Sequence, residues 1–319
     1  MRSIQQEVAK TQSGYLSKFD FVFKGVSVFC AALVLIIVCG MFIELVRSSA
    51  LSFHYFGFKF FISSEWNPVT QQFGALTSIY GTLVSTMIAM LIAVPLSLVI
   101  ALFLVELAPP KVSQIIGVAI ELLAAIPSII YGMWGLFVFA PFMADHVQPL
   151  LGKAGGNLPF FKGPPMGIGM LTAGIIIALM ILPFISSVTR DVFEMVPKVV
   201  KESAYGVGAT TWEVTKKVTI RYGLKGVIGA AFLGLGRALG ETMAVTFVIG
   251  NDHSISSSLF AAGNSIASTL ANEFTEASEP MYLSSLIELG LALYVITFIV
   301  QLFAHWWLAR VQKAAGSGL

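Results

Sequence analysis

Six apolar runs dominate this sequence, and each is long enough to cross a lipid bilayer as a helix. A bilayer core requires about 20 predominantly apolar helical residues. The runs cover 25–46, 75–105, 115–143, 166–188, 223–250 and 283–308. The 319-residue chain is 56% hydrophobic and only 11% charged, whereas a soluble domain has about 25% charged residues. The sequence therefore predicts an all-α polytopic membrane protein with six transmembrane helices.

The basic residues lie mainly on one side of the predicted membrane. Fourteen of the 19 Lys and Arg residues precede the first span, follow the last, or fall in the second and fourth loops. Loops rich in Lys and Arg usually remain in the cytoplasm. We therefore expect a cytoplasmic N-terminal segment (1–24), one six-helix transmembrane domain (25–310) with a cytoplasmic loop at about 190–225, and a cytoplasmic tail (311–319). The net charge of +2 is too small to indicate a nucleic-acid partner.

The loop between the fourth and fifth spans has a helical pattern of its own. Thr210 and Glu213 have the spacing of a capping box, in which each side chain bonds an amide of the same helix start. Two short helices are expected to meet at a glycine turn around Gly208 without crossing the membrane. Such a hairpin could be gripped by a soluble partner, or it could lie as an amphipathic element on anionic lipid.

This loop resembles the coupling loop of binding-protein-dependent ABC importer permeases. Glu202-Ser203-Ala204, then Gly208, then Val218-Thr219-Ile220 follow the family spacing of Glu-Ala-Ala, Gly and an apolar segment. Ser203 replaces the central alanine, and Arg221 stands where the family usually has proline. The resemblance implies a type I ABC importer permease fold and a loop that seats in an ATP-hydrolysing subunit. The residues carried over to that role are Glu202, Ser203, Ala204, Gly208, Thr210 and Trp212.

Three further segments are similar to the permease subunits of phosphate importers. These are Ile120–Ser128 continuing to Gly135, Gly234–Ala244, and Gly263–Ile266. The segment Ser63-Ser64-Glu65-Trp66-Asn67-Pro68 resembles the C-type permease subunit of that phosphate-specific system in particular. The resemblance implies half of a phosphate pathway in the bacterial inner membrane. It also implies a second, different permease chain, two ATP-binding subunits and an extracytoplasmic phosphate-binding protein as partners.

Two ionisable residues lie inside the fifth predicted span, away from its ends. A charge within a span costs at least about 2.5–3.5 kcal/mol, so each is a candidate functional group. Arg237 and Glu241 are four residues apart, and on one helix their side chains can pair. The pair could simply make both charges tolerable in the membrane. If phosphate passes here, guanidinium matches its geometry with two hydrogen bonds. We predict that Arg237 contacts the anion, that Glu241 is its counter-charge and that Thr242 lines the same pathway.

The chain lacks the motifs that would make it an ATPase or a metalloprotein. It contains no Gly-x-x-x-x-Gly-Lys-Ser/Thr segment, and its four histidines have no metal-ligand spacing. We therefore expect no metal and no cofactor in this chain, with ATP and Mg²⁺ bound by the partner ATPase. Two alternatives remain: a permease for another oxyanion such as molybdate or sulfate, and an intramembrane enzyme that uses Arg237 and Glu241.

Overall fold

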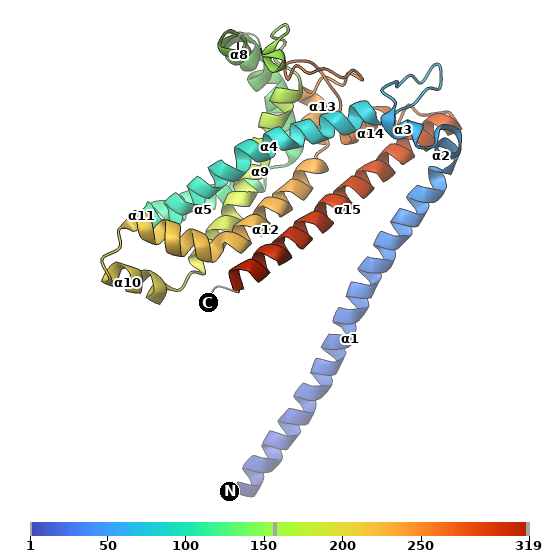
Figure 1. Cartoon of the computed structure of the whole chain (residues 1–319). Coiled ribbons are helices and arrows are strands. Elements are labelled where there is room, and N and C mark those ends of the chain that lie inside the picture. The colour runs from blue at the N-terminus through green and yellow to red at the C-terminus, as the bar shows by residue number, and fades with distance from the viewer. Residues whose placement is uncertain (1, 156–157, 317–319) are drawn as a thin grey trace.

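The computed structural model describes residues 2–155 and 158–316. In this part of the chain the long elements are all helices, and no strand is present beyond two isolated bridges (Figure 1). Six helices are long and apolar enough to cross a membrane. They are Asp20–Ser48, Leu76–Leu107, Ser128–Gly155, Met170–Glu194, Thr211–Leu239 and Pro280–Arg310. The predicted number of spans is therefore confirmed.

Four of the six spans lie close to the predicted ranges. They belong to α1 (Arg2–Ser48), α4 (Leu76–Leu102) with its π-helical end η1 (Phe103–Leu107), α9 (Met170–Glu194) and α15 (Pro280–Gly316). Helices α1 and α15 also continue through most of the two terminal segments. The end of the expected tail, residues 317–319, lies outside the described residues.

The predicted third span, 115–143, is wrong in its position. Its first part forms a separate helix, α5 (Pro110–Ala124), and the span itself is Ser128–Gly155. It consists of α6 (Ser128–Trp134), η2 (Gly135–Phe139), α7 (Ala140–Phe142), η3 (Met143–Val147) and α8 (Gln148–Gly155). The break falls at Pro127, which lacks an N–H group and disfavours helical geometry in the residue before it.

The fifth span is displaced in the opposite direction. Its helix starts at α11 (Thr211–Val214), continues through η5 (Thr215–Thr219) and ends with α12 (Ile220–Leu239). After Gly240 a separate short helix, α13 (Met243–Val248), follows. The predicted continuous helix 223–250 is therefore wrong, because the chain leaves the helical path at Gly240.

Helix α9 lies at the centre of the bundle. It packs against α4, α5, α12 and α13, and its buried face joins α4, α12 and α13 in one apolar cluster. Small residues allow the close approach to α4: a Cβ atom added to Gly174 would lie 2.6 Å from Cγ2 of Ile88. The main buried members of the cluster are Ala89, Ala93, Ile176, Ile177, Met180, Ile181, Ile185, Ala230, Val245 and Val248.

Helix α1 differs from the other spans because it leaves the bundle. Figure 1 shows it diverging from α15 along most of its length. None of its most apolar 18-residue window is buried. It meets α15 only towards its end, where the rings of Phe42 and Tyr294 lie 5.5 Å apart. Its apolar side chains from Phe21 to Val38 are thus exposed.

The two ends of the bundle carry different short elements (Figure 1). We call one the α14 end; it carries α2 (Ala50–Phe56), α3 (Lys59–Ile62) and α14 (Ile266–Glu273). We call the other the α10 end, after α10 (Lys198–Gly206). The 3₁₀ turn η4 (Pro159–Phe161) follows α8. A second apolar cluster, which includes Phe60, Phe73, Ile266, Leu286 and Leu289, fills the α14 end.

Candidate functional site

The helix break at Gly240 separates the two charges that the sequence places in the fifth span. Arg237 lies in the last turn of α12, whereas Glu241 lies beyond the end of that helix. The buried carboxylate of Glu241 accepts a hydrogen bond at 3.1 Å from the backbone amide of Ala244, at the start of α13. The described residues contain no ion pair between Arg237 and Glu241. The predicted pairing is therefore wrong, since it assumed one unbroken helix.

Arg237 keeps an exposed guanidinium at this break. It takes part in none of the ion pairs found within the described ranges. A cation in the last turn of a helix is favoured by the unpaired carbonyl groups there. The arrangement provides a positively charged donor within a membrane span, which is chemically suited to an anion.

Glycines in α6 and at the start of η2 allow the third spanning helix to approach α13 closely. A Cβ atom added to Gly132 would lie 2.9 Å from Cα of Ala244, and one added to Gly135 would lie 3.0 Å from Cγ1 of Val248. Thr242, the third predicted pathway residue, stands between α12 and α13, and its hydroxyl donates to the carbonyl of Gly240 at 3.2 Å. The packing therefore fixes the position of the break.

Gly236 lies on the side of α12 that faces α15. A Cβ atom there would come within 2.5 Å of the Gln301 amide nitrogen. Gly236 and Gly240 line a mostly apolar groove of about 440 Å³ together with Gly290, Tyr294 and other residues of α15. Gly236 thus permits a close contact between α12 and α15.

The loop at the α10 end is only partly as expected. Helix α10 ends before Gly208, whose φ of 87° favours glycine. The capping box of Thr210 and Glu213 is present. However, Thr210 starts the fifth spanning helix itself and not a second short helix. Arg221 explains the difference, because a proline at this position would interrupt the helix that here continues.

The predicted coupling residues lie on the surface of this loop. No residue of α10 is buried. Val207 is 86% exposed and Trp212 is 68% exposed. The loop therefore has solvent-exposed apolar side chains as well as the exposed carboxylate of Glu202. The Ser203 hydroxyl donates to the carbonyl of Val199 within its own helix at 2.7 Å. This surface offers both apolar area and charge to another protein.

Glu106 is an important residue of this region that the sequence reasoning missed. It lies in η1, at the end of α4, and its Oε1 atom accepts from Lys201 Nζ and from the Thr219 hydroxyl, each at 2.6 Å. The side chain of Glu106 is 6% exposed and that of Lys201 is 16% exposed. An acidic residue close to the end of an apolar run was the only available signal.

A second missed group is a polar network at the α14 end, centred on Glu273. Its carboxylate accepts from Trp66 Nε1 at 2.6 Å and from the Tyr282 hydroxyl at 2.7 Å, and it pairs with His253 at 2.9 Å. Burial raises the pKa of Glu273, but the hydrogen bonds from His253, Tyr282 and Trp66 outweigh it, so the pKa lies below its ordinary value. We call these four residues the Glu273 network.

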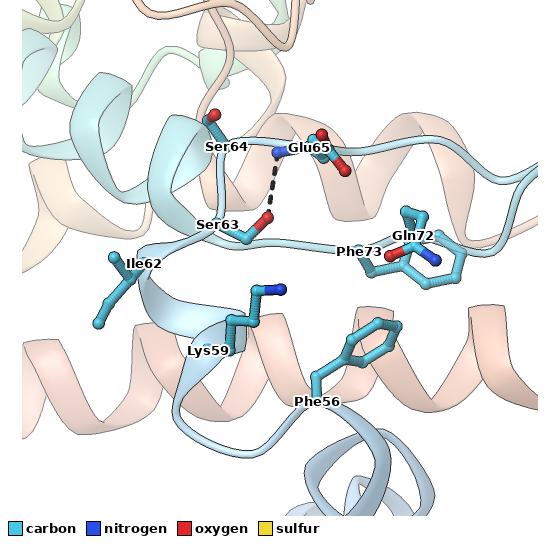
Figure 2. A pocket seen from close by; sticks show the side chains of 8 residues that line it. All are labelled: Phe56, Lys59, Ile62, Ser63, Ser64, Glu65, Gln72 and Phe73. Carbon is cyan, nitrogen blue, oxygen red and sulfur yellow. Dashed lines mark hydrogen bonds between the residues drawn. The ribbon is translucent and has the colours of Figure 1, made fainter.

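The segment Ser63–Glu65 borders a pocket of about 300 Å³ at the same end. Figure 2 shows Lys59, Ser63, Glu65 and Gln72 around it, with Phe56 and Phe73 on one side. The Ser63 hydroxyl accepts from the Glu65 amide at 3.3 Å. Both charged side chains of the pocket are exposed, so this is an open surface depression.

Comparison with known proteins identifies clear relatives. Residues 78–313 match the family model described as "Binding-protein-dependent transport system inner membrane component". The phosphate transport system permease protein PstC of Mesorhizobium japonicum is 54% identical, over 93% of this chain and 92% of its own. The protein of the same name from Pasteurella multocida is 50% identical, over 93% and 94%.

The fold also matches a solved structure. The crystal structure of a bacterial ABC transporter involved in the import of the acidic polysaccharide alginate aligns with a TM-score of 0.64, at 16% identity, over 92% of this chain and 97% of that one. At this identity the likeness concerns the fold alone. It confirms the predicted fold class, that of type I ABC importer permeases.

Proposed function

Because this chain belongs to the family of binding-protein-dependent transport system inner membrane components, and within it to the PstC-type permeases, we propose that it forms half of the pathway of an ATP-driven importer of inorganic phosphate. Members of the family are multi-pass membrane proteins and transport components of a larger complex, not enzymes. The names of the relatives support phosphate as the cargo. The structural observation that most directly supports this proposal is the unpaired guanidinium of Arg237 at the helix break.

The chemistry at this break suits a tetrahedral oxyanion. Guanidinium donates two parallel hydrogen bonds to phosphate, and among the described residues no carboxylate forms an ion pair with Arg237 that would compete for them. Transport also requires that binding is weak enough for release. Glu241 serves this by holding the start of α13 through Ala244, while its negative charge lies close to the bound anion. Thr242 contributes a hydroxyl to the same pathway.

The energy comes from other subunits. ATP and Mg²⁺ are bound by two separate ATP-binding subunits, and these seat on the surface formed by α10 and the start of α11. Glu202, Ser203, Ala204, Gly208, Thr210 and Trp212 form that contact. The exposure of α10 and of Trp212 supports this assignment. The α10 end and both termini are accordingly cytoplasmic, and an extracytoplasmic phosphate-binding protein docks at the α14 end.

A second permease chain completes the pathway. The support is the position of α1, whose apolar faces contact little of this chain except near its end. Bilayer lipid can cover these faces, but a helix held away from its own bundle is well placed to pack on a neighbouring one. We assign that neighbour to a different chain, which makes the permease unit a heterodimer.

The cargo is tested by uptake into proteoliposomes that contain the complete complex, its binding protein and internal ATP. Labelled phosphate uptake should require ATP and persist in the presence of excess sulfate or molybdate. Uptake of sulfate or molybdate in place of phosphate would overturn the assignment of the cargo. The fold and the coupling loop would be unaffected by that result.

A further inference from the structure

Helix α10 is fastened to the membrane-spanning helices through one carboxylate oxygen. Oε1 of Glu106 accepts from Lys201 Nζ on α10 and from the Thr219 hydroxyl of η5, each at 2.6 Å. Thr219 is fully buried. One atom of η1 thus links the coupling helix, the end of α4 and the fifth spanning helix.

The rest of α10 is attached weakly. None of its residues is buried, and the Ser203 hydroxyl bonds within the helix. Among the described residues, the Lys201–Glu106 ion pair is the only side-chain hydrogen bond or ion pair that joins α10 to a spanning helix. Helix α10 also packs against α11 and η5, so a force applied to it by another protein reaches the bundle through this packing, along the backbone and through the ion pair.

The two helices joined by Glu106 are the ones that lead to the predicted pathway. Helices α4 and α12 pack on each other and on α9. Thr219 and Arg237 lie on the same continuous helix, 18 residues apart, which corresponds to about 27 Å of rise. Because the two residues share one helix, a displacement of its Thr219 end is passed towards its Arg237 end through the helix backbone.

We propose that Glu106 is a positioning residue for energy coupling: through Lys201 and Thr219 it makes α10, α4 and the fifth spanning helix move as one body when the ATPase subunits act on α10. The proposal rests on the proposed function of the loop. A low-dielectric site strengthens such charge-assisted bonds. The Lys201–Glu106 ion pair has a short N–O distance of 2.6 Å and is largely shielded from water. It is therefore well suited to hold α10 and α4 together when α10 is displaced.

The first test measures how many phosphate ions are taken up for each ATP hydrolysed by the reconstituted complex. Glu106→Gln and Lys201→Met should each retain the ATPase subunits and hydrolyse ATP, with uptake per ATP reduced by about tenfold. The exchanged pair Glu106→Lys with Lys201→Glu should recover most of the loss. Glu194→Gln is the matched control, because Glu194 forms an exposed i,i+4 pair with Arg190 at the same end. Such pairs contribute little, and its ratio should be unchanged.

Normal uptake per ATP in Glu106→Gln would overturn the proposal. Loss of the ATPase subunits from that variant would also overturn it, because the ion pair would then serve docking instead of transmission. Failure of the exchanged pair to recover any coupling would show that the charges do not act on each other.

A second measurement is independent of the cargo. Spin labels at Val99 in α4 and at Val207 beside α10, both exposed, report the distance between the two elements after the free Cys30 and Cys39 are replaced by serine. ATP should leave this distance unchanged in the parent complex and alter it in Glu106→Gln. A change of equal size in both would contradict the proposal, even if phosphate were not the cargo.

Discussion

The two ends of this protein are built in opposite ways. At the α14 end, the Glu273 network joins a loop, a second loop and α15 through three contacts to a single carboxylate, and the rings of Trp66 and His253 are stacked 5.4 Å apart. At the α10 end, the coupling helix has no buried residue and one ion pair to the bundle. One end is held together by its own chain, whereas the other leaves its surface to a partner.

The difference indicates where each end obtains its rigidity. A buried polar group that loses its partner destabilises the folded state by about 1–3 kcal/mol. Separating the elements around Glu273 should therefore cost at least this much free energy. Among the described residues, helix α10 takes part in no comparable network. The same substitution should therefore have a large effect at the α14 end and a small one at the α10 end.

The largest expected difference in the loss of stability is between alanine substitutions of two glycines. A Cβ atom at Gly81 would lie 1.8 Å from the backbone oxygen of Asn264, whereas Gly206 in α10 has nothing within 4 Å. Gly81→Ala should lower stability by about 1–3 kcal/mol or more, because the backbone on both sides must shift. Gly206→Ala should change it by about 1 kcal/mol or less. Thermal unfolding of the purified protein measures both, and equal midpoints would contradict the comparison.

The next contrast is between two glutamates. Glu273→Gln removes the charge that accepts from Trp66 and Tyr282, and it should cost about 1–3 kcal/mol. Glu202→Gln, on exposed α10, should leave the unfolding midpoint unchanged. Chemical unfolding in detergent separates the two cases. An unchanged midpoint in Glu273→Gln would mean that the network is not a source of stability.

The pH dependence sharpens the Glu273 prediction. Because folding lowers the pKa of this carboxyl, its contribution to stability is complete above the ordinary glutamate pKa of about 4.3. It is lost as the pH falls through the folded value. The stability difference between the parent protein and Glu273→Gln should thus be constant near neutral pH and shrink in more acidic solution. A difference that grows on acidification would reverse the assigned sign.

The smallest expected effect is at the capping box of the α10 end. Thr210→Ala removes the side chain that accepts from the Glu213 amide, at a typical cost of about 1 kcal/mol. Because Thr210 is exposed, the loss should be confined to the first turn of α11. Amide hydrogen exchange should rise there and remain unchanged around Glu273. Faster exchange at both ends would show that the two ends are not independent.

Apolar run length was sufficient to predict six spans, but it could not place the breaks. The predicted residue ranges of the third and fifth spans were wrong because the helices break at Pro127 and Gly240. Both residues lie within continuous apolar stretches, so hydropathy alone does not reveal the breaks. Arg237 could be selected as a candidate pathway residue because a charged residue within a membrane span is unusual. The predicted ion pair with Glu241 was wrong because i,i+4 pairing requires an unbroken helix.

The two polar networks could not be predicted because their members are distant in the sequence. Glu106 lies 95 residues from Lys201 and 113 from Thr219, and Glu273 lies 207 residues from Trp66. Local patterns cannot reveal such pairs, which arise only after the helices pack. The capping box was predictable, because both of its members lie within one turn.

The central claim is that the guanidinium of Arg237 is the anion contact of the pathway. Its most direct test is phosphate uptake by the complete reconstituted complex carrying Arg237→Gln, compared with Lys225→Gln, which removes an exposed cation of the same helix. Losing a hydrogen bond to a charged group costs about 1.5–3 kcal/mol, so Arg237→Gln should reduce uptake by roughly tenfold to a hundredfold in a normally assembled complex. Lys225→Gln should transport normally. Equal uptake by the two variants would contradict the claim.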